Sequence, residues 1–475
     1  MNKKFFAALA SATMAFTASG SIAVFADDFV EEKTPVVDGN VVKPQEALTV
    51  KWDKEHFGDL ATENGEVNPN VTWDGYTPQL DKDGLVKTED LKDVKSITFE
   101  ATFKGEIKGL NYFPGLETFD DSKVASTKKV TNKTLDFSAN TKLTGLTVNN
   151  ANDLTKLVLP EAIVNEDEEE EFALKSLDLQ ATELTALDVT KYDQLTTVTV
   201  AYNNNLKDVT LLHGTKAHPT AYGDVDLSYN SIETIDLSNC AFNSLKLNNN
   251  HIGVIDFSKT TLAANANLDD QTLYVSETLA TVNLKDTFGD VDTHDFSATD
   301  GYNARTGVLD LSKAQAYNYV SEAKKGGVQT LKVTLVAANP MNRLYNPNSG
   351  EHFYTADIKE KAALVKLGWA DEGYGWVAPK KGEGEKVVYR LYNPNAGDHH
   401  YTVNAQEKNT LVTYGWKFEG EGWESAANTG IAVYRQYNPF ANGAGSHNYT
   451  VDKAENDHLV SLGWTPEGKA WFGLK

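Results

Sequence analysis

The residues best able to do chemistry lie in the last third of the chain, where one pattern of polar and aromatic residues occurs three times, about 47 residues apart. The repeated set comprises Arg343, Arg390 and Arg435; Tyr345, Tyr392 and Tyr437; and Trp376, Trp423 and Trp471. Guanidinium groups can grip carboxylates or hydroxyls, and aromatic faces can stack on sugar rings. We therefore predict these residues as ligand contacts. The alternative is that they recur because one core is built three times.

A metal site is the second kind of chemistry that the sequence offers. Three repeated histidines could meet on a threefold axis as metal ligands, namely His352, His399 and His447. Upstream, Asp81 and Asp83 stand before Gly84 at the spacing of a calcium loop, but Gln79 occupies the first ligand position and Asp90 the last, where glutamate is usual. We interpret this segment as a degenerate calcium loop. We predict no cofactor, with calcium as the alternative.

Enzymatic chemistry finds little support in the sequence. No GxSxG, HExxH or Walker motif occurs, and the single cysteine, Cys240, excludes an intrachain disulfide and a CxxC site. Carboxylates are numerous, but repeated strands expose them in rows, whereas catalysis needs a pair in a pocket. The sequence predicts a protein that is not an enzyme and has no catalytic residues.

A second repeat defines the elements upstream of these residues. Between 135 and 257, short triplets recur in which two apolar residues flank one other residue. Such triplets are typical of strands with two side chains inward and one outward. Clean steps are about 20–22 residues, inside the roughly 20–29 residues of leucine-rich repeats. Two triplets per step leave no room for a helix, so we predict a flat coil with strands on both sides.

The triplets also predict which side chains face solvent and which link the coils. One outward row should contain Thr147, Asp178, Thr199, Asp226, Lys246 and Tyr274, and the other Asp136, Asp188, Asp236 and Asp256. We interpret both rows as solvated residues that keep the strand faces from aggregating. Buried turn amides are expected at Asn140, Asn203, Asn230 and Asn250, with Cys240 packed at the equivalent place.

These repeats resemble those of a known family. Leu135-Asp136-Phe137-Ser138-Ala139-Asn140 and Ile235-Asp236-Leu237-Ser238 are similar to the leucine-rich repeats of secreted, internalin-like bacterial proteins, and 107–116 looks like the first coil after such a family's N-terminal cap. The resemblance covers roughly 91–285. It implies a solenoid that binds a protein or a glycan on its concave face, and it names no ligand.

Each C-terminal repeat predicts the same series of elements: a strand, an Asn-Pro turn, a strand, a short helix ended by glycine, and a hairpin that runs from one tryptophan to the next. The first tryptophan of each pair is Trp369, Trp416 or Trp464. One such unit is too small to bury a core, so we expect three to close around a pseudo-threefold axis, as in a β-trefoil or small propeller. Between the two repeat systems, we predict a helix over 312–325 and a strand over 328–337.

The motifs Arg343-Leu344-Tyr345-Asn346-Pro347 and His352-Phe353-Tyr354-Thr355, with the Gly-Trp pairs that follow, resemble an uncharacterised triple-repeat domain of secreted Gram-positive proteins. The resemblance covers 341–475. It implies an accessory binding or targeting module, for cell-wall or other glycans.

Charge and leader sequence restrict the partners and the compartment. The net charge of −23 excludes nucleic acid as a natural partner, because phosphate contacts need clustered Lys and Arg. Residues 339–475 carry 14 basic and 16 acidic residues, so most of the acidity lies upstream. We interpret 1–26 as a signal peptide, with a basic start, an apolar stretch and a small-residue cleavage site. The mature protein should be extracellular, non-covalently associated with the cell wall, and without a membrane span.

These patterns predict a mainly β protein with five parts: a signal peptide (1–26), an N-terminal cap (27–90), a leucine-rich-repeat solenoid (91–290), a C-terminal cap (291–338) and a triple-repeat domain (339–475). Its expected function is adhesin-like: the solenoid binds a protein or glycan, and the last domain binds cell-wall or host glycan. The alternatives are an accessory protein of a polysaccharide-active hydrolase, or a spacer or inhibitor of another secreted protein.

Overall fold

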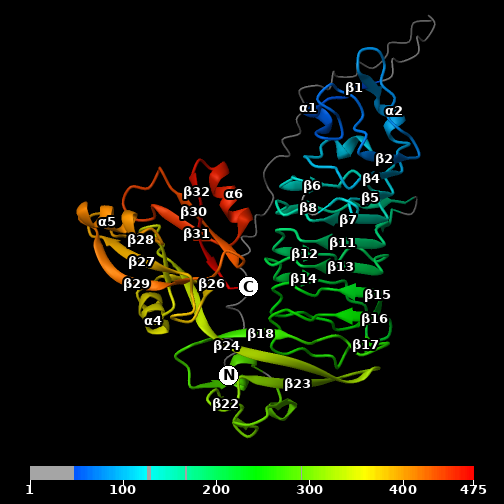
Figure 1. Cartoon of the computed structure of the whole chain (residues 1–475). Helices are drawn as coiled ribbons and strands as arrows, with labels where there is room; N and C mark the ends of the chain where they lie inside the picture. The colour runs from blue at the N-terminus through cyan, green and yellow to red at the C-terminus, as the bar shows by residue number, and fades with distance from the viewer. Residues whose placement is uncertain (1–47, 126–129, 166–167, 290, 475) are drawn as a thin grey trace, which may run out of the picture.

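The computed structural model describes residues 48–125, 130–165, 168–289 and 291–474, so the predicted signal peptide lies outside the described residues. A long solenoid and a smaller C-terminal domain lie side by side, joined by strands at one end of the solenoid (Figure 1). Strands dominate both parts, which confirms the predicted mainly β class. No helix in the described part of the chain is long and apolar enough to cross a membrane.

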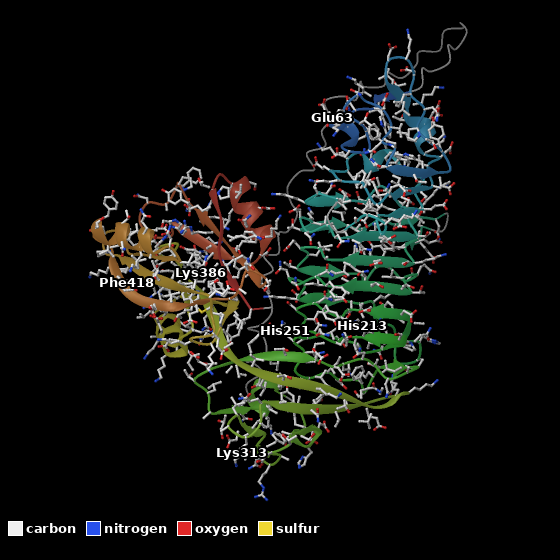
Figure 2. The ribbon with its side chains drawn as sticks, viewed as in Figure 1. Glu63, His213, His251, Lys313, Lys386 and Phe418 are labelled. Atoms are coloured by element: carbon white, nitrogen blue, oxygen red, sulfur yellow. The ribbon has the colours of Figure 1, made fainter. Side chains whose placement is uncertain are left out.

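One nine-stranded sheet forms a whole side of the solenoid. In spatial order it contains β17 (Thr261–Leu262), β16 (Cys240–Lys246), β15 (Thr220–Asp226), β13 (Thr197–Ala201), β11 (Ser176–Gln180), β7 (Gly145–Asn149), β5 (Thr118–Asp120), β4 (Ser96–Phe99) and β2 (Val71–Asp74). All neighbours are parallel except β2 and β4. Apolar residues of every coil point into a continuous core, and Figure 2 shows these side chains filling the coil.

The opposite side of the solenoid has shorter strands. They are β6 (Thr134–Asp136) paired with β8 (Lys156–Val158), and β12 (Ala186–Asp188) paired with β14 (Asp208–Thr210). A small hairpin, β9 (Ile163–Val164) with β10 (Glu170–Glu171), projects from this region. The predicted strands at 235–237 and 255–257 carry no strand assignment. Strands on both sides of the coil are thus present in the earlier coils only.

Buried asparagines link the coils, as their spacing predicts. Asn230 donates to the carbonyls of Val200 and Leu227 at 2.6 and 2.8 Å. The same kind of bond is made by Asn140, Asn203 and Asn250. The second acidic row has a local role, because each carboxylate accepts the N–H two residues ahead; the four are Asp136, Asp188, Asp236 and Asp256.

Caps close both ends of the solenoid. The N-terminal cap contains β1 (Thr49–Lys51), α1 (Lys54–Phe57), β3 (Leu85–Lys87), α2 (Thr88–Leu91) and, at the first coil, the 3₁₀ turn η1 (Leu110–Tyr112). Trp52 stacks on Phe57 there at 4.1 Å between ring centroids. The C-terminal cap contains β18 (Gln271–Ser276), β19 (Thr281–Asn283), α3 (Leu284–Phe288), η2 (Thr293–Asp295), β20 (Phe296–Ser297), β21 (Tyr302–Asn303), β22 (Val308–Asp310), β23 (Ala316–Ala323) and β24 (Gly327–Tyr345). These caps shield the apolar ends that an open solenoid would expose.

The helix predicted over 312–325 is wrong. This segment forms β23, in which buried Tyr317 and Tyr319 alternate with exposed neighbours at the two-residue period of a strand. Tyr317 pairs with Val333 of β24, so the aromatic side chains reach the core by sheet pairing. The predicted strand over 328–337 lies within β24, which runs on into the C-terminal domain. Tyr274 lies on β18, which pairs with β24 outside the nine-stranded sheet, so it does not extend the outward row.

The C-terminal domain consists of three separate three-stranded antiparallel sheets. The end of β24 pairs with β25 (His352–Thr355) and β26 (Ala370–Ala378); β27 (Lys386–Asn393) with β28 (Asp398–Thr402) and β29 (Lys417–Ser425); and β30 (Ile431–Tyr437) with β31 (His447–Thr450) and β32 (Thr465–Gly473). Each repeat adds one helix: α4 (Ile358–Lys366), α5 (Ala405–Thr413) or α6 (Lys453–Ser461). Asp357, Asn404 and Asp452 cap these helices through their side chains.

Two details of this domain differ from the prediction. The segment from one tryptophan to the next forms a single strand with a register shift, and no hairpin, because β26, β29 and β32 each pair along their length with the first strand of their repeat. The three sheets remain separate and do not join into one barrel. The arrangement is therefore propeller-like, and the trefoil does not apply.

The third repeat of the C-terminal domain contacts the flank of the solenoid, where α6 faces it (Figure 1). Lys133 of the solenoid lies 2.9 Å from Asp457, and Lys453 lies 4.0 Å from Asp153. Where α6 has Lys453, α4 and α5 have Ile358 and Ala405. The charged contact is thus specific to one repeat.

Candidate recognition surfaces

The repeated arginines join the three repeats to one another. Arg390 lies 3.0 Å from Glu419 of its own repeat and 3.1 Å from Glu360 on the helix of the preceding repeat. The other two repeats have the same pairs, Arg343 with Glu372 and Glu455, and Arg435 with Glu467 and Glu407. Each guanidinium therefore already has two carboxylate partners. These ion pairs favour the alternative of one core built three times, and ligand contact by the arginines stays a prediction.

The second tryptophan of each repeat lies on the pseudo-threefold axis. Trp376, Trp423 and Trp471 are buried, and their ring centroids are 5.5–5.6 Å apart in all three pairings. A layer of three fully buried tyrosines packs against them, namely Tyr354, Tyr401 and Tyr449. These tryptophans are 5, 7 and 2% exposed, which leaves little ring surface for the predicted stacking on sugars. Trp369, Trp416 and Trp464 are instead the partly exposed ones.

The repeated tyrosines and histidines lie beside one another near the ends of the strands. The ring centroids of Tyr345 and His352, of Tyr392 and His399, and of Tyr437 and His447 are 5.0, 4.9 and 5.4 Å apart. Each histidine also lies 3.4 Å from a glutamate of its own repeat. Among the described residues, the group of side chains close enough to share a metal ion does not include these histidines. The tyrosines stay predicted contacts, and Tyr392 borders a hollow.

The calcium-loop candidate forms a tight turn. Asp81 accepts the N–H groups of Asp83 and Leu85 at 2.8 and 2.9 Å through one carboxylate oxygen. Within the described ranges, the group of three side chains close enough to share a metal ion is Asp53, Glu55 and His56, and it includes neither predicted aspartate. Asp53 is already the N-cap of α1. The turn therefore explains Asp81 without calcium.

Cys240 is buried, and burial raises the pKa of its thiol to about 12. The thiolate is the reactive form of cysteine, so this thiol should be inert in the folded protein. We expect no reaction with a thiol-specific disulfide reagent at neutral pH in buffer, and reaction with one thiol per chain in denaturant. Rapid modification of the folded chain would contradict the packed role.

The nine-stranded sheet presents the outward row that the repeats predict. Asp120, Thr147, Asp178, Thr199, Asp226 and Lys246 are successive cross-strand neighbours. Lys246 pairs with Asp226 at 2.9 Å, whereas Asp178 has no cation beside it among the described ion pairs. Burial, with the charges of Asp120 and Asp226, raises the pKa of Asp178. This part of the face has an excess of acid.

Two exposed tyrosines border this row. Tyr202 and Tyr229 follow β13 and β15, stack at 4.5 Å with 11° between their rings, and are 52% and 42% exposed. Both have left-handed backbone, with φ of 61° and 58°. The same place in other coils is left-handed too, and it holds Asn150, Ala181, Asn249 and Asp270. Bulky residues are rare in this conformation, and Asn and Asp are preferred.

This pair is not among the predicted ligand contacts, although the sequence contains a signal for it. Each tyrosine directly precedes a ladder asparagine, Asn203 or Asn230, at a position where the later coil places Asn249 before Asn250. A tyrosine in a turn position that suits asparagine costs backbone energy and exposes an aromatic ring. The local fold does not require it, which makes the Tyr202–Tyr229 pair a candidate recognition site.

Comparison with known proteins gives one family match and several structural likenesses. Residues 340–474 match the family described as "Domain of unknown function (DUF5648)". Solved structures from Listeria monocytogenes are similar to about half of this chain. They are the functional domain of InlJ (19% identity, TM-score 0.25, 48% of this chain and 50% of that one), the internalin-like protein lmo2027 (14%, 0.22, 54% and 90%) and InlP (16%, 0.23, 54% and 91%). The alignment thus spans half of the InlJ domain. These likenesses identify no ligand. No curated protein matches the chain in sequence.

Proposed function

We propose that this chain is a non-enzymatic, extracellular binding protein whose nine-stranded sheet recognises a protein partner through a segment rich in Lys and Arg. The observation that carries the proposal is the stacked Tyr202–Tyr229 pair beside the acidic row. Exposed aromatic residues dominate the energetics of protein interfaces. This pair occupies positions where the left-handed backbone favours another residue type.

The chemistry of the face favours a cationic segment. A Lys or Arg stem can pack on the tyrosine rings while its charge approaches Asp178, which has no ion-pair partner among the residues that the structure describes. An anionic segment would meet Asp120, Asp178 and Asp226. The C-terminal domain serves as a second binding module in this proposal, attaching the protein to cell-wall or host glycan.

The proposal predicts that the double variant Tyr202→Asn/Tyr229→Asn binds its partner more weakly but is not less stable. Asparagine should relieve the strain of the left-handed backbone, which costs roughly 1–2 kcal/mol per residue. The variant also loses the stacking contact between the two rings, which stabilises the fold by about 0.5–1.5 kcal/mol. We therefore expect the melting temperature to stay the same or rise. Binding of peptides selected on the wild-type chain from a random display library should weaken at least tenfold, and those peptides should be enriched in Lys and Arg.

The matched control is Tyr414→Asn, which removes a tyrosine that is 76% exposed on the C-terminal domain. It should leave the affinity of the selected peptides unchanged. The proposal is wrong if the selected peptides are acidic or apolar, or if they bind the double variant as tightly as they bind the wild type.

A further inference from the structure

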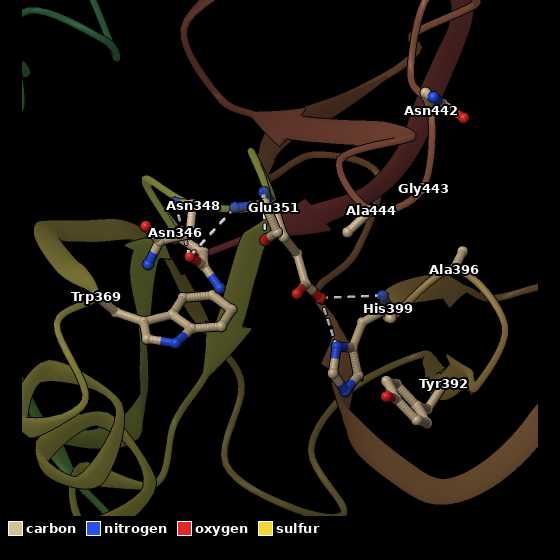
Figure 3. Close-up of a pocket in the computed structure, with 12 residues that line it drawn as sticks. Asn346, Asn348, Glu351, Trp369, Tyr392, Ala396, His399, Asn442, Gly443 and Ala444 are labelled. Atoms are coloured by element: carbon tan, nitrogen blue, oxygen red, sulfur yellow. Dashed lines mark hydrogen bonds and ion pairs between the residues drawn. The ribbon is translucent and has the colours of Figure 1, made fainter.

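The C-terminal domain carries a hollow of about 510 Å³ where all three repeats meet (Figure 3). Trp369 of the first repeat and Tyr392 of the second border it on separate elements, and the loop 442–444 of the third repeat closes another side. Pockets for small ligands usually have volumes of roughly 300–1,000 Å³. The hollow therefore has the size of a binding site for a small molecule or for part of a chain-like one.

Aromatic side chains beside the hollow form a continuous series. Phe353 lies between Trp369 and His399, with ring centroids 6.0 and 4.8 Å away, and His399 packs on Tyr392 at 4.9 Å. Trp369, Tyr392 and His399 are each partly exposed. Rings held by neighbours on both sides keep their orientation, which suits stacking on a flat apolar face of a ligand.

The junction between the second and third repeats has an equivalent series, in which His400 lies between Trp416 and His447 with ring centroids 5.9 and 4.6 Å away. The position of Phe353 is taken by His400 in the second repeat and by Asn448 in the third. The loop 442–444 is an insertion that only the third repeat has. It lines this hollow, and the first two repeats have no equivalent loop. The inserted loop is therefore what distinguishes this hollow from the other junctions, and core packing does not account for it, because Asn442 and Gly443 are exposed.

Polar groups of the hollow are fixed in place by the chain. Glu351 is buried, and one of its oxygens accepts the backbone N–H of His399 at 3.0 Å and contacts Nδ1 of the same residue at 2.5 Å. Asn346 accepts the N–H of Asn348 at 3.0 Å through its side-chain oxygen, which leaves its NH₂ group as a donor. The hollow thus offers a carboxylate and an amide in set orientations next to the aromatic rings.

The charge of the hollow restricts its ligand. No lysine or arginine is among the residues that line it, and Glu351 contributes a carboxylate. An anionic ligand would find no counter-charge there. Pyranose rings have an apolar face for stacking and hydroxyl groups that both donate and accept hydrogen bonds, so an uncharged saccharide meets each of these features.

We propose that this hollow binds an uncharged saccharide, with Trp369 stacking on a sugar ring and Glu351 and Asn346 bonding its hydroxyl groups. The inference rests on the proposed role of the C-terminal domain as a binding module, and it is independent of the solenoid face. It assigns a ligand class and a site within 340–474.

The test is calorimetric titration of the full chain with chitotetraose and with cellotetraose, and with an oligogalacturonate as the anionic comparison. We expect one or both uncharged sugars to bind, and Trp369→Ala to weaken binding at least tenfold. Trp416→Ala removes the equivalent tryptophan of the next repeat and should leave the affinity unchanged. Ala444→Trp fills the hollow without removing any contact and should also abolish binding, which keeps the proposal testable if Trp369→Ala unfolds.

Cosedimentation with insoluble peptidoglycan and with mucin-coated beads, competed by the bound tetrasaccharide, distinguishes the two sources of such sugars. Absence of binding to both tetrasaccharides at millimolar concentration would overturn the proposal, as would binding of the oligogalacturonate alone or equal losses from Trp369→Ala and Trp416→Ala. The selected peptides should still bind Trp369→Ala, so failure of the saccharide site leaves the solenoid proposal standing.

Discussion

Replacement of Trp423 by alanine should lower the free energy of unfolding of the C-terminal domain by about 3–5 kcal/mol, the usual loss for a buried large aromatic residue. The indole packs between Trp376 and Trp471 at 5.6 and 5.5 Å and against Tyr401 at 5.1 Å. Its removal opens a cavity on the axis that all three repeats share. Six of the eight tryptophans lie in this domain, so urea unfolding followed by tryptophan fluorescence reports mainly on it.

The comparison variant is Trp416→Ala, seven residues earlier in the same repeat. Trp416 is partly exposed and lies outside the buried axis cluster. We therefore expect Trp416→Ala to lower the free energy of unfolding by less than half as much as Trp423→Ala does. Equal losses from the two variants would contradict the assignment of the second tryptophans to the core.

Replacement of Arg435 by methionine should cost a comparable amount, about 3–5 kcal/mol, because it removes one partner of partly buried ion pairs. Arg435 lies 2.8 Å from Glu467 and 3.2 Å from Glu407, and methionine keeps much of its aliphatic volume while leaving both carboxylates without their cation. Lys417→Met removes an exposed lysine without a described ion pair and should change stability little. A loss below 1 kcal/mol for Arg435→Met would show that the ion pairs contribute only as surface pairs do.

The same pairs predict the dependence of stability on pH. Burial raises the pKa of Glu407, but hydrogen bonds with His400 and Thr402 and the charge of Arg435 outweigh it and lower the pKa from 4.5 to about 2. A carboxylate whose pKa is lower in the folded state than in the unfolded state stabilises the fold at pH values above its unfolded pKa. This stabilisation is lost as the pH falls from about 4.5 to 2. The difference in unfolding free energy between wild type and Arg435→Met should therefore be smaller near pH 3 than at pH 7. An unchanged difference would contradict the link between Glu407 and Arg435.

The sequence predicted the architecture well because both repeat systems express a period. The triplets place Thr147, Asp178 and Thr199 in one cross-strand row, and the turn asparagines lie where their spacing requires. The segment 316–323 was wrongly predicted as a helix because its many polar residues obscured the alternation around Tyr317 and Tyr319. Its pairing with β24 is a tertiary contact that local composition does not reveal.

The candidate sites were harder to predict for one physical reason. Recurrence in every repeat does not distinguish a ligand contact from a structural residue. Arg390 and Trp423 recur at positions where every repeat has the same ion pairs and axis packing. Residues that differ from those at the same position in the other repeats are better candidates, because they make one surface different from the matching surfaces of the other repeats. The Tyr202–Tyr229 pair and the loop 442–444 are of this kind, and only the structure shows that each lies on an accessible surface.

The most direct test of the central claim, that the nine-stranded sheet is the recognition surface, is hydroxyl-radical footprinting of the full chain with and without a selected peptide. Oxidation of Tyr202 and Tyr229 is expected to fall strongly when the peptide binds, while oxidation of Tyr414 on the C-terminal domain stays constant as the internal reference. Unchanged oxidation of both solenoid tyrosines under saturating peptide would contradict the account.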